Sequence, residues 1–242
     1  MNLYFLTEDS KSFRKVLPKW LSYILPHFHE ESSFDSLKSP GNHYMIQDGK
    51  GYPGIRNRVA ETVETLAVKN VPLDQFIVCW DGDARGGGHI REDKAAFAAL
   101  LERNNVNYPY RFFVMRHCFE TWLLGNRAVY PRDGLSEAFA PYAAFYDVSA
   151  DDPEKMLRPR GYAASVSQYH YHYLQEMLRN SIHKNYSKGS PGVAKEKAYW
   201  DELCQRTRQT PDLRSFADFL DFLRECRIQS YEGDARDGTV HQ

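Results

Sequence analysis

Short apolar runs alternate with amphipathic stretches along the first half of the chain. Residues 3–6 and 76–80 are continuous apolar runs, which are typical of strands in a parallel sheet covered on both faces. Residues 43–46 and 110–115 indicate two further strands. Between these runs, apolar residues recur every three or four positions, as in amphipathic helices. The pattern predicts an α/β fold with a parallel sheet and helices on both faces.

The predicted helices of this half each follow a strand. The first carries its apolar face from Phe13 to Ile24, and Pro18 is expected to kink it or to end its first part. The second is expected to end near Asn70. A third carries Phe97 on its apolar face, and a fourth begins near Phe119.

The pattern changes after residue 125 and divides the chain into three parts. Residues 1–125 form the α/β domain, and residues 126–160 lack a period and predict an irregular connection. Residues 161–242 are predicted to be mostly helical, with one helix over 166–182 and a last helix that begins at Thr210-Pro211 as N-cap and first residue.

Composition narrows the class of protein. The chain of 242 residues is 42% hydrophobic and has a formal net charge of -1, so it is globular and has no overall field that attracts nucleic acid. Its four cysteines are widely separated and form no zinc motif, which favours a reducing, cytoplasmic compartment. No apolar stretch is long enough for a membrane span, and no signal peptide is expected.

Acidic residues follow two of the predicted strands. Glu8 comes after the first strand, and Asp81 and Asp83 follow the third. Ligands of open parallel sheets bind at the carboxyl ends of the strands, so the three carboxylates are expected to face one crevice if these strands are neighbours. Such a set of oxygen ligands suits Mg²⁺ or Mn²⁺ and metal-assisted phosphoryl transfer. Alternatively, Glu8 caps a helix, and Asp81 with Asp83 forms only a polar turn.

Further residues are candidates for the same crevice. Glu120 lies on the helix after the fourth strand and is a candidate fourth metal ligand. Alternatively, it caps that helix or pairs with an arginine. Residues that could bind substrate flank the acids on both sides, although each alone also suits a surface or capping position. They are Arg85, His89, Lys94, Arg116 and His117.

Three segments together resemble a known family. They are Leu-Thr-Glu-Asp at residues 6–9, Val-Cys-Trp-Asp-Gly-Asp-Ala at 78–84 and Arg-His-Cys-Phe-Glu-Thr-Trp-Leu-Leu at 116–124. This set resembles Toprim domains, particularly those of the RloB-like and OLD-like groups associated with bacterial defence. The resemblance implies that Glu8 is a general acid or base, that Asp81 and Asp83 bind Mg²⁺, and that Glu120 belongs to the site. Asp9 stands where many family members have glycine, and it could bind metal or cap the helix.

The resemblance favours a Mg²⁺-dependent endonuclease that cleaves DNA or RNA as an anti-phage defence effector. Because the chain has no GxxxxGK[ST] loop, any ATP-driven step would need a separate ATPase subunit. The alternative is a non-catalytic Toprim-like regulatory or interaction subunit of a defence complex. A phosphatase of the haloacid-dehalogenase type fits less well, because its DxD motif ends the first strand.

Basic residues gather in the C-terminal part. Residues 155–197 contain eight Lys or Arg side chains against two acids, interleaved with tyrosines. This composition suits a nucleic-acid groove, in which basic side chains neutralise phosphates and tyrosines stack on unpaired bases. It equally suits a solvated helix face with tyrosines in the core. The basic residues are Lys155, Arg158, Arg160, Arg179, Lys184, Lys188, Lys195 and Lys197.

Overall fold

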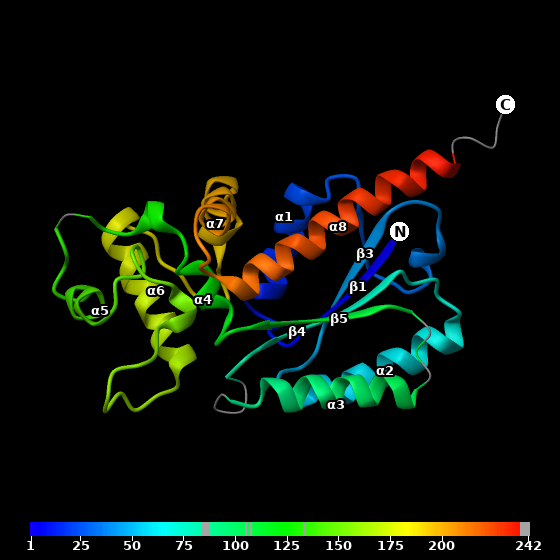
Figure 1. Cartoon of the computed structure of the whole chain (residues 1–242), viewed down its shortest axis with the longest axis horizontal. Helices are drawn as coiled ribbons and strands as arrows, with labels where there is room; N and C mark the ends of the chain where they lie inside the picture. The colour runs from blue at the N-terminus through cyan, green and yellow to red at the C-terminus, as the bar shows by residue number, and fades with distance from the viewer. Residues whose placement is uncertain (84–87, 105, 107, 133, 238–242) are drawn as a thin grey trace. The chain divides into compact units, whose positions relative to one another are not determined.

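The computed structural model describes residues 1–83, 88–104, 106, 108–132 and 134–237, with side chains as far as Tyr231. Its strands form a parallel five-stranded sheet in the order β2-β3-β1-β4-β5 (Figure 1). The predicted α/β class is confirmed. The strands are β1 (Asn2–Thr7), β2 (His29–Glu31), β3 (His43–Asp48), β4 (Gln75–Asp81) and β5 (Tyr110–Met115).

The chain forms two compact units. The first comprises Met1–Cys79, Ile90–Phe113 and the chain from Asp218 onward. The second comprises Trp80–His89 and Val114–Ala217. This division differs from the predicted one at residues 125 and 160, because the last helix returns to the first unit.

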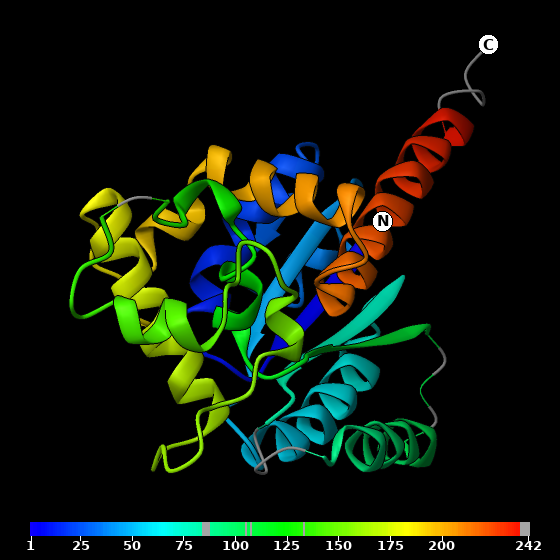
Figure 2. The same ribbon diagram turned by 60° about the vertical axis from the view of Figure 1, so that its left-hand side comes forward.

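Helices cover both faces of the sheet in the first unit. Figures 1 and 2 show α2 (Gly54–Lys69) and α3 (Ile90–Arg103) side by side on one face. On the other face lie α1 (Phe13–Ile24) and the part of α8 (Arg214–Asp237) that belongs to this unit. Phe219 of α8 packs edge-on against Phe13 and Phe113, with ring centroids 6.0 and 5.2 Å apart. These aromatic contacts are the physical reason why α8 belongs with the sheet.

The second unit is mainly helical, as predicted for the C-terminal part. The segment expected to be irregular, 126–160, contains three short helices. The elements of this unit are α4 (Phe119–Leu123), η2 (Arg127–Val129), α5 (Ala140–Phe145), η3 (Pro153–Lys155), α6 (Val166–Ile182), η4 (Gly192–Lys195) and α7 (Lys197–Gln209).

Local sequence signals set several boundaries correctly. Helix α2 ends at Lys69, and its C-cap Asn70 adopts a left-handed conformation with φ 49° and donates its N–H to the carbonyls of Ala67 and Leu66. Helix α6 begins after Ser165, whose side chain accepts the N–H of Gln168. Helix α1, in contrast, is a single element through Pro18.

The predicted start of the last helix is wrong. Thr210 is the C-cap of α7, and α8 begins at Arg214. Carboxylates distant in sequence stabilise this later start: Asp152 accepts the N–H of Leu213 at 3.1 Å, and Glu154 accepts the N–H of Ser215 at 3.0 Å. Side chains that precede the helix by some 60 residues therefore outweigh the local Thr-Pro signal.

Buried cysteines occur in both units. Cys79 and Cys226 lie in the first unit, and Cys118 and Cys204 in the second, and no disulfide joins any of these described residues. Burial raises the pKa of the Cys79 thiol and raises that of Cys226 to about 12. In the part of the chain that the structure describes, no helix has the length and apolar character needed to cross a membrane.

Candidate functional site

The turn after β4 is fixed by close contact with the segment after β5. A Cβ atom on Gly82 would lie 2.5 Å from the carbonyl oxygen of Arg116 and 2.7 Å from that of Met115, so only glycine fits. The N–H of Gly82 donates to Met115 O at 2.8 Å, and the N–H of Asp83 donates to His117 O at 3.2 Å. These contacts hold the Asp81-Gly82-Asp83 turn against the carboxyl end of β5 and the residues that follow it.

Glu120 is a fully buried carboxylate on α4. It is 0% exposed, and its Oε1 accepts a hydrogen bond from the Tyr186 hydroxyl at 2.9 Å. Its Oε2 lies 3.7 Å from Lys188 Nζ and has no hydrogen-bond partner among the described residues. A buried charge is costly unless it is neutralised, and Lys188 neutralises this carboxylate in part without a hydrogen bond to Oε2. A further cation at this oxygen would therefore be stabilised.

Asp81 and Glu120 act on a common neighbour. Burial and then the charges of Glu120 and Asp81 raise the pKa of the Cys118 thiol well above its usual value. Cys118 is the residue before α4, and its Sγ lies 3.8 Å from Ser167 O. Two of the predicted metal ligands therefore lie near enough to one buried thiol for their charges to raise its pKa.

Asp83 lies at the start of α6. Its Oδ2 accepts the N–H of Ser167 at 3.0 Å, where the positive end of the helix dipole favours a carboxylate. Ser165 caps the same helix through Gln168, so Asp83 supplies a second acceptor to this helix end. Ser167, 84 residues further along the chain and in the same unit, thus orients the carboxylate of Asp83.

Hydrogen bonding fixes the tautomer of His117. Its Nε2 lies 3.2 Å from the carbonyl oxygen of Glu154, which can only accept, so Nε2 carries the proton. The neutral ring therefore presents Nδ1 as an acceptor. Burial is the main cause that lowers the pKa of His117, with a smaller contribution from Arg116, while Glu154 O and Asp83 oppose it.

The other predicted site residues fall in both units. Glu8 and the exposed Lys94 belong to the first unit, where the Glu8 N–H donates to Cys79 O at 2.8 Å. His89 and the exposed Arg116 belong to the second. Arg85 lies outside the described residues.

The neighbouring Asp9 has a capping role. Its carboxylate accepts the N–H groups of Lys11 at 2.7 Å and of Phe13 at 3.0 Å, together with both donors of Ser12. All of these donors lie at or just before the start of α1, where orphan N–H groups need acceptors. Of the two roles considered for Asp9, helix capping is the one its contacts display.

A crevice shared by Glu8 and the aspartates is expected only if the first and third predicted strands are neighbours. These strands, β1 and β4, are parallel neighbours, with Thr7 opposite Cys79. Glu8 nevertheless belongs to a different unit from Asp81, Asp83 and Glu120, and its participation in one site with them stays a prediction. Within the described ranges, no three or more His, Cys, Asp or Glu side chains form a group that could hold a metal ion.

Three partners of the acids were not foreseen from the sequence. Tyr186 and Lys188 reach Glu120 from a turn before η4, and Ser167 reaches Asp83 from α6. These contacts span 66 to 84 residues, and no local motif announces them. Lys188 could have been suspected only as one member of the basic cluster.

The tyrosines of that cluster belong largely to the core. Tyr169 and Tyr173 are 3% and 0% exposed, and Tyr173 packs edge-on against Phe139 with ring centroids 5.4 Å apart. Several of the basic residues have acidic partners: Arg179 pairs with Glu176, Lys188 with Glu120, and Lys197 with Asp201. This favours the core interpretation for these two tyrosines. Four basic residues of the cluster are exposed and belong to none of these pairs: Lys155, Arg158, Arg160 and Lys184.

No family model, no curated protein and no solved structure matches the chain.

Proposed function

We propose that the chain is a metal-dependent endonuclease whose second unit binds a divalent cation with Asp81, Asp83 and Glu120, although these three carboxylates do not form a preformed metal group in the described structure. The observation that carries this proposal is the buried Oε2 of Glu120, which has no hydrogen-bond partner in the described chain and shares the neighbour Cys118 with Asp81. The available donors are carboxylate oxygens, which suit Mg²⁺ or Mn²⁺ better than zinc. By the Toprim resemblance, Glu8 is the proposed general acid or base.

The residues of the site have separate roles in this proposal. Asp81, Asp83 and Glu120 hold the cation, which supplies Lewis-acid polarisation of a phosphate oxygen. His117, with its proton on Nε2, has Nδ1 as the proposed acceptor for a proton from water or substrate. Exposed Arg116 offers a positive charge to the phosphate backbone. By the Toprim resemblance, the substrate is DNA or RNA, the role is bacterial defence, and a separate ATPase is the proposed partner.

Purified protein tests the proposal with plasmid DNA and cellular RNA in Mg²⁺ or Mn²⁺. We expect wild type to cut one of these substrates, and Asp81→Asn and Glu8→Gln to abolish cutting. Mn²⁺ binding, followed by electron paramagnetic resonance, should weaken at least about 10-fold in Asp81→Asn, because one charged ligand is lost.

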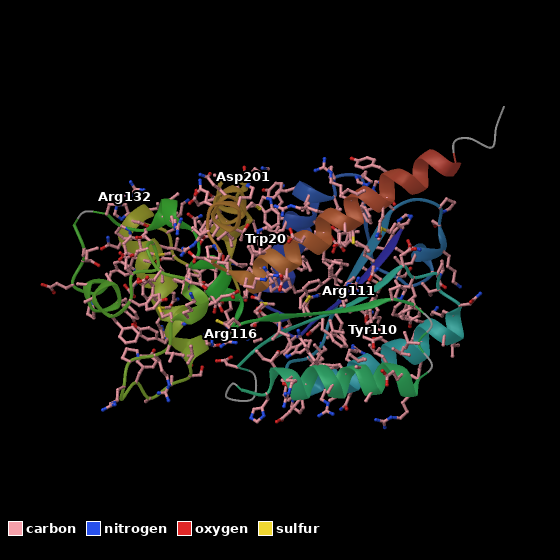
Figure 3. The ribbon with its side chains drawn as sticks, in the orientation of Figure 1. Trp20, Tyr110, Arg111, Arg116, Arg132 and Asp201 are labelled. Carbon is pink, nitrogen blue, oxygen red and sulfur yellow. The ribbon has the colours of Figure 1, made fainter. Side chains whose placement is uncertain are left out.

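A matched control is Asp201→Asn on α7, which removes one exposed carboxylate from the same unit (Figure 3). It should cut and bind Mn²⁺ like wild type. Equal cutting by wild type and Asp81→Asn would exclude the proposed metal centre.

A second candidate is a non-catalytic regulatory or interaction subunit. The observation in its favour is that Asp83 and Glu120 already have protein partners, Ser167 for the first and Tyr186 with Lys188 for the second. Mg²⁺-dependent binding of nucleic acid without cleavage, by wild type and with Mn²⁺ present, would favour this candidate over the nuclease.

A further inference from the structure

A pocket of about 480 Å³ lies in the second unit and has no role in the proposed reaction. This volume is within the range of about 300–1,000 Å³ that small-molecule sites occupy. The pocket is lined by two arginines, one acid, a hydroxyl group and three side chains with apolar surface. These residues are Arg127, Tyr130, Pro131, Arg132, Leu135, Asp147 and Ser149.

Arg127 carries a charge that the protein only partly neutralises. Its side chain is 25% exposed, and its Nη2 donates to Asp212 Oδ2 at 3.3 Å. Arg206 donates to the same oxygen through Nε at 3.1 Å and Nη2 at 2.8 Å, so one carboxylate oxygen serves two guanidinium groups. Arg127 Nε is buried without a hydrogen-bond partner among the described residues. An anion in the pocket would complete the neutralisation of Arg127.

Arg132 supplies a second positive charge at the pocket. It is exposed (Figure 3), and it has no ion pair within the described part of the chain. A guanidinium group can bind phosphate by two parallel hydrogen bonds. Phosphate is therefore the anion best suited to the side of the pocket that carries Arg127 and Arg132.

The rest of the lining favours more than a bare phosphate. Asp147 accepts the N–H of Ser149 at 2.9 Å and its hydroxyl at 2.7 Å. Burial opposes ionisation of Asp147, but hydrogen bonds from Ser149, Ala150 and Tyr130 together lower its pKa. An ionised Asp147 repels a phosphate placed next to it but accepts from hydroxyl or N–H groups. Leu135, 46% exposed, and Tyr130 add apolar and aromatic surface for a ring.

We infer that this pocket binds a nucleotide unit, with its phosphate on Arg127 and Arg132 and its sugar or base toward Asp147, Tyr130 and Leu135. The ligand is either a free nucleotide or one nucleotide of a nucleic-acid chain, since both present the same phosphate, sugar and base. This inference goes beyond the proposed nuclease activity and does not depend on the acids that would hold a metal.

Titration calorimetry in EDTA tests the inference without any contribution from a metal site. The probes are AMP, adenosine, inorganic phosphate and a five-nucleotide single-stranded RNA. We expect AMP or the RNA to bind, with adenosine and inorganic phosphate at least 10-fold weaker. Arg132→Ala should weaken this binding about 10-fold.

Arg160→Ala is the matched control, because it removes one exposed arginine from the same unit outside the pocket lining. It should bind like wild type. Arg127→Gln should also weaken binding, and thermal unfolding of both variants verifies that they are folded. Arg132-dependent binding of AMP identifies a free nucleotide, and such binding of the RNA alone identifies a nucleotide within a chain. Inorganic phosphate binding as tightly as AMP, or no Arg132-dependent binding of AMP or RNA, would overturn the inference.

Discussion

Replacing Arg206 with Met is expected to lower the free energy of unfolding of the second unit by about 3–5 kcal/mol, the usual cost of removing one partner of a buried ion pair. Arg206 is 0% exposed and donates to Asp212, 2.8 Å away. It also donates to the carbonyl oxygens of Val148 at 2.6 Å, Asp151 at 2.8 Å and Gly125 at 3.2 Å. A Met side chain fills similar volume but leaves all these acceptors without their donor.

Urea unfolding measures this effect, and Arg208→Met is its matched control. Arg208 lies two residues further along α7 and is exposed, so its replacement should change stability by less than about 0.5 kcal/mol. Arg206→Lys should fall between the two, because an ammonium group keeps the charge but cannot reach acceptors in several directions. Equal stability of the Met variants would show that Arg206 does not hold the unit together.

As the second large effect, we expect the folded chain to become less stable at acidic pH because of His170. Burial, with a smaller contribution from the charge of His117, lowers the pKa of His170 from 6.5 to about 3. Between pH 6.5 and about 3, His170 therefore binds a proton in the unfolded chain but not in the folded chain. The stability that the neutral ring contributes is fully present above pH 6.5 and is lost as the pH falls toward 3. Each pH unit costs up to about 1.4 kcal/mol, which predicts a loss of about 2 kcal/mol between pH 7.5 and 5.0.

The structure explains why this ring resists protonation. His170 Nδ1 is 2.8 Å from Thr121 Oγ1, and its Nε2 donates to Met156 O at 3.1 Å, so both nitrogens already have partners. His117 packs edge-on at 5.0 Å, and its own lowered pKa adds to the loss with the same sign.

Unfolding of wild type and His170→Gln at pH 7.5 and 5.0 tests this expectation. The variant should lose most of the pH dependence, even if it is less stable at both values. His172→Gln, on the same helix but only partly buried, should keep the dependence of wild type. A wild-type slope that survives in His170→Gln would assign the acid sensitivity to another group.

Much of the fold follows from local patterns in the sequence. The strands predicted at 3–6, 43–46, 76–80 and 110–115 correspond to β1, β3, β4 and β5. They could be predicted because each strand is an apolar run, a pattern that is visible in the local sequence alone. Strand β2, His29–Glu31, was missed because it is three polar residues at the sheet edge, where pairing with β3 rather than its own pattern forms the strand.

The candidate site could be predicted only in part. The motif around Asp81 and Asp83 is local, and its position at the end of β4 follows from the apolar run before it. The groups that surround Glu120 come from distant segments, and burial of a carboxylate beside Tyr186 is a tertiary outcome. The sequence therefore indicates where these acids lie better than it indicates which groups surround them.

The four buried thiols have a practical consequence. Thiolate is the form that reacts with alkylating reagents. Burial shields all four thiols in the folded chain, and a raised pKa further lowers the thiolate fraction of Cys79, Cys118 and Cys226. Cys79 and Cys226 report on the first unit and Cys118 and Cys204 on the second, so every natural cysteine is a built-in reporter of opening. The order in which they are alkylated separates the opening of one unit from that of the other without introducing any label.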